Sequence, residues 1–160
     1  ELNKILEREN SAYRFIGGKV TPITSSEEIE EIEKALAASD AYAGARTHLK
    51  TSLVLLTDRT NPDYRNSIKE SISAVESLVK KLVGDDKATL GQALKILEAK
   101  HNLHASMKSA FMTLYGYTSD AGGIRHALLD SSTAPNKADA RFMLICCSAF
   151  INFAIDTIED

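Results

Sequence analysis

The stretch DYRNSIKESISAVESLVKKLVG, residues 63–84, has the clearest helical periodicity in the chain and decides the expected fold. Its apolar residues recur every three or four positions, as on one face of an amphipathic helix: Ile68, Ile72, Val75, Val79 and Leu82. Gly84 follows and is suited to closing the helix, while Pro62 precedes it and is suited to a helix start. A long helix with one apolar face must pack on other helices, so the stretch predicts one element of a bundle.

The segments on both sides of this stretch also predict helices. Upstream, residues 24–39 begin with capping side chains and first-turn glutamates, and a longer helix follows from Asp40 to about Arg59 despite Gly44. Downstream, TLGQALKILEAKH and HASMKSAFMTLYGY predict two shorter helices. The last helix, from about Asn136, is apolar on nearly all sides, which predicts a central place in the bundle or in a dimer interface.

The N-terminal part predicts a short helix and a small hairpin. The helical pattern that begins in ELNKILEREN stops near Asn10, and strand-forming residues then flank Gly17-Gly18 in AYRFIGGKVTPI. The expected fold class is therefore mainly all-α: an antiparallel helical bundle with a small N-terminal β-hairpin. We expect residues 1–60 to pack on a bundle of residues 61–160 in one compact unit. The start at Glu1, inside a helical pattern, favours a piece of a longer protein.

Composition restricts the classes of function. The net charge of the 160 residues is -3, so RNA contact would need a local basic patch rather than an overall positive field. The sequence has no signal-peptide pattern and no uninterrupted apolar run of membrane-spanning length, so we expect a soluble cytoplasmic domain without membrane contact. The adjacent Cys146 and Cys147 lie in an apolar run, where packing in a reducing compartment is expected.

No motif predicts a metal or a cofactor. His101 and His104 are three residues apart, but no acidic partner accompanies them, and a surface or capping role is favoured. The segment GGIRH lacks the Gly-x-x-x-x-Gly-Lys-Ser/Thr pattern of a phosphate loop, and no Gly-x-Ser-x-Gly of a serine hydrolase is present. We therefore expect no metal and no cofactor.

Arg125-His126, in YGYTSDAGGIRHALLD, is the strongest candidate for chemistry. A histidine can remove the 2′-hydroxyl proton of RNA or protonate the leaving oxygen, and an arginine can stabilise the phosphorane charge. The structural alternative is that Arg125 pairs with a carboxylate and His126 packs in the bundle. Glu76 is expected to be partly buried and to need an arginine partner, for which Arg125 is a candidate. Arg65 opens its helix with Asn66, and the two either face the bundle end that residues 122–126 reach or form a solvated first turn.

Together, the stretches NPDYRNSIKESISAVESLVKKL, TLGQALKIL, LYGYTSDAGGIRHALLD and ADARFMLICCSAFINFAI resemble the helical C-terminal region of bacterial abortive-infection proteins, a region similar to the HEPN superfamily. The resemblance covers about residues 61–158, and the preceding part looks like a segment that often precedes such domains. It implies a bundle of four or five helices, often a homodimer, and in many members a metal-independent ribonuclease acting in phage defence.

The resemblance also has a clear departure. The family signature places a histidine four to six residues after an arginine, whereas here Arg125 and His126 are adjacent. Two hypotheses follow. In the first, the domain is an antiviral endoribonuclease with Arg125, His126, Glu76 and Arg65 as its catalytic set, RNA as substrate and a homodimer formed through the last helix. In the second, it is a non-catalytic dimerisation or sensor domain of a larger defence protein.

Overall fold

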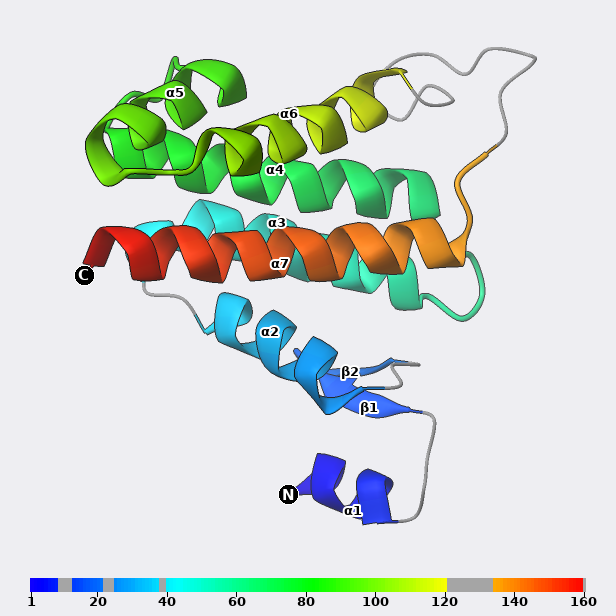
Figure 1. Ribbon diagram of the computed structural model, residues 1–160. Helices are drawn as coiled ribbons and strands as arrows, with labels where there is room; N and C mark the ends of the chain where they lie inside the picture. The colour runs from blue at the N-terminus through cyan, green and yellow to red at the C-terminus, as the bar shows by residue number, and fades with distance from the viewer. Residues whose placement is uncertain (9–12, 22–24, 38–39, 121–133, 160) are drawn as a thin grey trace.

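The computed structural model describes residues 1–8, 13–21, 25–37, 40–120 and 134–159. It confirms the expected fold class, because the described chain is mainly helical and carries one two-stranded antiparallel sheet (Figure 1). The elements in chain order are α1 (Leu2–Arg8), β1 (Arg14–Ile16), β2 (Lys19–Thr21), α2 (Ser26–Leu36), a 3-10 turn η1 (Asp40–Tyr42), α3 (Ala43–Thr57), α4 (Tyr64–Val83), α5 (Leu90–His101), α6 (Ala105–Asp120) and α7 (Lys137–Glu159).

Helix α4 is the centre of the bundle and is formed by the stretch with the strongest periodicity. The helix begins at Tyr64, two residues after Pro62, where the start was expected. Asp63 caps it, and the Asp63 carboxylate accepts the Asn66 backbone N–H at 2.9 Å. Gly84 closes the helix with φ of 72°, a left-handed conformation that suits glycine. Helices α3, α5, α6 and α7 all pack against α4. The expected boundary at residue 60 falls in the loop that joins α3 to α4, two helices that pack closely together.

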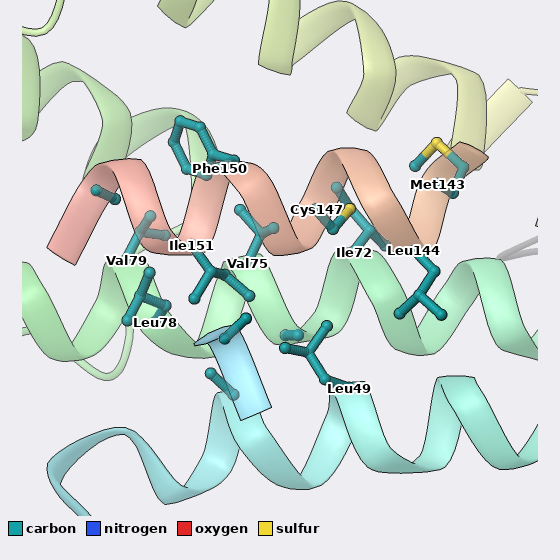
Figure 2. Close-up of a cluster of buried hydrophobic side chains, with 14 of the residues drawn as sticks. Leu49, Ile72, Val75, Leu78, Val79, Met143, Leu144, Cys147, Phe150 and Ile151 are labelled. Atoms are coloured by element: carbon teal, nitrogen blue, oxygen red, sulfur yellow. The ribbon is translucent and has the colours of Figure 1, made fainter. Parts of the chain in front are cut away.

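The core lies mainly where α3, α4 and α7 meet (Figure 2). The predicted apolar positions of α4 are buried there, except that Leu82 is only partly buried. Side chains from the three helices interdigitate at this place: Leu49, Ile72, Val75, Leu78, Val79, Met143, Leu144, Cys147, Phe150 and Ile151. Helix α2 adds Ile29, Ile32 and Ala35 to the same core. Burial of this apolar surface is the main stabilising contribution to the bundle.

The predicted hairpin forms at the expected residues and packs on the bundle. Gly17 and Gly18 have φ of 51° and 84°, as a tight two-residue hairpin turn requires. A side chain at Gly17 would come within 3.2 Å of Leu36 and of Leu53, so the turn lies close to α2 and α3. On the sheet, Ile16 is buried, whereas the paired Phe15 and Val20 point away from the core and are each 39% exposed.

Helix α7 buries one face against the rest of the bundle, and the alternative place of its other face in a dimer interface stays a prediction. Met143, Leu144 and Ile151 are fully buried, but Phe142 is 57% exposed and Phe153 is 40% exposed. Within the described residues, α7 is also the one helix long and apolar enough to span a membrane, with a mean hydropathy of 1.5. Core helices of soluble proteins meet the same criterion, and α7 packs against α2, α3 and α4.

Candidate functional site

The strongest sequence candidates, Arg125 and His126, lie in residues 121–133, outside the described part of the chain. The surrounding elements nevertheless fix where that segment is attached. Helix α6 ends at Asp120 and α7 begins at Lys137, and both ends are at the same end of the bundle, on the right in Figure 1. Helix α3 ends and α4 begins there as well. The ends of α3 and α6 and the starts of α4 and α7 therefore lie at one end of the bundle, which we call the converging end.

Arg65 and Glu76 both lie on α4 but at different positions along its axis. Arg65 is in the first turn, at the converging end, and is half-buried, as is Glu76. Eleven residues separate them, which places their backbones on the same helical face but about 16 Å apart along the axis. This separation is too large for both side chains to contact one reacting group. Each of them makes an interaction of its own. The partial burial expected for Glu76 is confirmed, and its role and that of Arg65 stay predictions.

The other polar residues singled out in the sequence have structural roles. His104 accepts the Ser106 backbone N–H at 3.2 Å through Nδ1 and so caps the start of α6, in line with the capping role expected for this pair. Asn66, next to Arg65, donates its side-chain amide to Asp63 at 2.6 Å and reinforces the cap of α4. Among the described residues, no group of three or more His, Cys, Asp or Glu side chains is arranged to hold a metal.

The two cysteines are unsuited to nucleophilic chemistry. Cys147 is fully buried in the core, and burial raises the pKa of its thiol far above the usual range, with a smaller effect from Cys146. Cys146 is partly buried, and burial also raises its thiol pKa. Because the thiolate is the reactive form, both side chains are held in the unreactive form at neutral pH. The expectation that they serve packing agrees with this geometry.

A buried cluster of serine hydroxyls between α3 and α4 was not predicted from the sequence. Ser52 Oγ lies 2.7 Å from Ser71 Oγ and 3.0 Å from Ser67 Oγ, and it also contacts the Ser67 carbonyl oxygen at 2.9 Å. All three serines are 0% exposed. No histidine takes part in the hydrogen bonds of this cluster, so no base activates a hydroxyl there. The cluster joins two helices rather than forming a catalytic site.

A pocket at the converging end was not predicted from the sequence either. It has a volume of about 540 Å³ and lies between the hairpin, the α3–α4 loop and the start of α7. Its lining includes two aromatic, two cationic and one anionic side chain: Tyr13, Tyr64, Arg59, Lys137 and Asp58. These residues are up to 124 positions apart in the sequence, so no local motif announces the pocket.

A second feature is an apolar stripe along the outer face of α7, which we define as Ala138, Phe142, Ile145, Cys146 and Phe153. Four of these residues, from Ala138 to Cys146, line a shallow groove of about 350 Å³ together with Glu28 of α2 and Arg141. Acidic and basic side chains thus border the exposed Phe142. The stripe lies on the last helix, which is the helix predicted to form the homodimer.

Comparison with known proteins identifies the N-terminal part of the chain. Residues 1–38 match the family model described as AbiJ N-terminal domain 4. The match spans α1, the hairpin and α2, and it stops before α3. No curated protein and no solved structure matches this chain. The matched segment supports an abortive-infection protein of phage defence.

Proposed function

We propose that this chain is a HEPN-like domain of an abortive-infection protein and that it cleaves RNA without a metal. One observation supports the proposal: the two helix ends that flank the segment with Arg125 and His126, the end of α6 and the start of α7, lie at the end of the bundle where a pocket contains two cationic side chains. The match of residues 1–38 to an abortive-infection family provides the biological context.

In the proposed reaction the RNA 2′-hydroxyl attacks the neighbouring phosphorus and the bond from phosphorus to the 5′-oxygen breaks. His126 removes the 2′-hydroxyl proton or gives a proton to the leaving 5′-oxygen, with water in the other of these two roles, and Arg125 stabilises the negative charge of the phosphorane. The products are a 2′,3′-cyclic phosphate and a 5′-hydroxyl. Arg65, in the first turn of α4, would help to orient the two catalytic side chains. Glu76 is about 16 Å further along α4 and would act through other residues.

The test is cleavage of labelled RNA by the chain in EDTA, with Arg125→Ala and His126→Ala variants whose folding is checked by circular dichroism. Loss of a general acid or base should lower the rate by about 100-fold or more in His126→Ala. Lys95→Ala, an exposed change on α5, serves as the matched control and should cleave like the unaltered chain. Absence of cleavage by the unaltered chain, or cleavage that persists in folded His126→Ala, would refute the proposal.

The apolar stripe of α7 favours a second candidate, a homodimerisation domain. An antiparallel pairing of two α7 helices would cover both stripes, and the opposite charges of Arg141 and Glu28 beside Phe142 suit an isologous contact. The measurement is the molar mass in solution by light scattering. A dimer that becomes a monomer in Phe142→Ser, but not in Lys95→Ala, supports this contact. A monomer at all concentrations would exclude it.

A further inference from the structure

The pocket at the converging end is built from parts that the sequence keeps far apart. Tyr13 and Val20 come from the hairpin, Arg59 and Pro62 from the α3–α4 loop, and Tyr64 from the first turn of α4. Lys137, the first residue of α7, completes the lining. The volume of about 540 Å³ is in the range of small-molecule sites, and the wall combines aromatic, apolar and charged groups.

The charges in the pocket favour an anion. Within the described chain, neither Arg59 nor Lys137 makes an ion pair with another side chain. Asp58, the one acid in the lining, is already engaged: it accepts the backbone N–H groups of Asn61 at 2.9 Å and Thr60 at 2.8 Å. These hydrogen bonds, with a smaller contribution from Lys19, lower the pKa of Asp58. Asp58 is therefore engaged by the backbone of its own loop, and within the described residues the two lining cations have no ion pair that would keep them from a ligand.

The nearby helix N-termini do not compete for that anion. At the start of α4, Asp63 already accepts the Asn66 backbone N–H. At the start of α7, Asn136 Oδ1 accepts the backbone N–H of Ala138 at 2.7 Å, and Asp139 in turn accepts the backbone N–H of Asn136 at 2.8 Å. Because these backbone donors are satisfied by the chain's own caps, an anion in the pocket would be held by the side chains of Arg59 and Lys137.

The aromatic walls indicate what else the ligand carries. Tyr13 is 48% exposed at the pocket, and Tyr64 is partly buried against the core, so one ring is accessible and the other is held in place. Inorganic phosphate alone would leave both rings unused, and an apolar ligand would leave two cations without a partner. A flat heteroaromatic ring joined to a phosphate satisfies both features, because bases stack on tyrosine and phosphates pair with arginine and lysine.

We infer that this pocket binds a nucleotide, with its phosphate at Arg59 and Lys137 and its base against Tyr13 or Tyr64. The lining that the structure describes is made of other residues than Arg125 and His126, so the inference goes beyond the proposed cleavage reaction and does not rest on it. A free mononucleotide and a nucleotide within single-stranded RNA offer the same chemistry.

Calorimetric titration of the full chain tests the inference. The probes are 5′-AMP, 5′-UMP, adenosine, inorganic phosphate and a 2′-O-methyl pentanucleotide, which cannot undergo attack by a 2′-hydroxyl. We expect a nucleotide or the pentanucleotide to bind more tightly than adenosine and phosphate. Binding of the mononucleotides identifies a free nucleotide as sufficient, and binding of the pentanucleotide alone identifies an RNA strand.

Variants then locate the site. Arg59→Ala and Lys137→Ala should each weaken binding about tenfold or more, because each removes a charge-assisted contact. Tyr13→Leu or Tyr64→Leu should weaken it about tenfold through lost stacking. Tyr64 also packs on the core, so Tyr13→Leu tests stacking if Tyr64→Leu does not fold. Lys95→Ala, on α5 at the far end of the bundle, should bind unchanged.

The result separates this site from the cleavage reaction. Folded His126→Ala should bind nucleotide like the unaltered chain even if it no longer cleaves RNA. If none of the phosphate-bearing nucleotides binds, or if Arg59→Ala and Lys137→Ala bind as well as Lys95→Ala, the inference is wrong. That outcome would leave a cleavage activity that depends on Arg125 and His126 untouched.

Discussion

Asn152 of α7 donates its side-chain amide to both the backbone carbonyl oxygen and the carboxylate of Glu31 in α2, at 2.9 Å and 2.8 Å. Glu31 lies in the segment that matches the abortive-infection family, and Asn152 lies in the bundle. Asn152 is 4% exposed, so this contact is largely shielded from water. It joins two parts of the chain that are 121 residues apart.

Replacing Asn152 with leucine should destabilise the protein by about 1–3 kcal/mol, because the two partly buried hydrogen bonds to Glu31 are lost while the side-chain volume is kept. The measurement is urea unfolding followed by circular dichroism. Thr157→Ala on the same helix is the control, since the Thr157 hydroxyl donates to the Phe153 carbonyl of its own helix. Equal stability of Asn152→Leu and the unaltered chain would mean that this contact does not help to hold α2 on α7.

The buried serine cluster predicts a second stability effect. Ser52→Ala should cost about 1–3 kcal/mol, because Ser67 and Ser71 would each lose a buried partner. Ser71→Ala should cost less, since Ser52 would keep its contacts with Ser67. The double variant should be less destabilised than the sum, which denaturant unfolding can measure as a coupling energy. Thr51→Ala, exposed on the same helix, is the control. Additive losses would show that the two hydroxyls act independently.

Local features of the sequence predicted the fold well. The three-and-four spacing of apolar residues in α4 and the Gly17-Gly18 turn are short-range signals, and both elements formed where expected. The exposed side of α7 could not be predicted in the same way, because its apolar residues surround the helix and neighbouring elements decide which are buried. Phe142 is exposed since no described element covers that face, whereas Met143 beside it is fully buried.

The candidate site was less predictable. The sequence proposed Arg65 and Glu76 as members of one set, but helical rise places them about 16 Å apart on α4. The pocket could not be anticipated, because Tyr13, Arg59 and Lys137 are brought together only when the hairpin packs beside the two helix ends. The serine cluster was missed for a related reason: Ser52 and Ser71 are typical surface residues by type, and their burial depends on the pairing of α3 with α4.

Gly44 in α3 gives a prediction about close packing. A Cβ atom at Gly44 would come within 2.5 Å of Ser77 Oγ on α4, but it would be 3.7 Å from the Ser77 Cβ atom. With Ser77 in place, Gly44→Ala should therefore lower the free energy of unfolding or leave it unchanged, because the Ser77 hydroxyl must move. In a Ser77→Ala background the same change should stabilise by about 0.5–1 kcal/mol through the better helix propensity of alanine. Thermal unfolding of the four proteins measures the difference. An identical effect of Gly44→Ala in both backgrounds would argue against the close approach.

The cysteines give a prediction with a defined pH dependence. Burial raises the pKa of both thiols, so they are protonated and unreactive in the folded chain. The measurement is the rate of reaction with a disulfide reagent at pH 8, in buffer and in urea. In Cys146→Ala the remaining Cys147 should react far more slowly in the folded state than in urea. In Cys147→Ala the remaining Cys146 should show a smaller difference between the two states. Rapid labelling of Cys147 in the folded state would contradict its burial.

The same shift has a consequence for stability. The folded-state pKa of Cys147 lies above its unfolded-state value, so its contribution to the free energy of unfolding is complete below about pH 8.5 and falls as pH rises. Above that pH the loss should approach about 1.4 kcal/mol per pH unit for this thiol, because the unfolded chain releases the proton and the folded chain keeps it. Urea unfolding at pH 7.5 and pH 10 measures the effect. Lysine and tyrosine titrate in the same range, but Cys147→Ala retains them, so a smaller decrease in that variant isolates the thiol. An equal decrease in both proteins would assign the alkaline instability to those other groups.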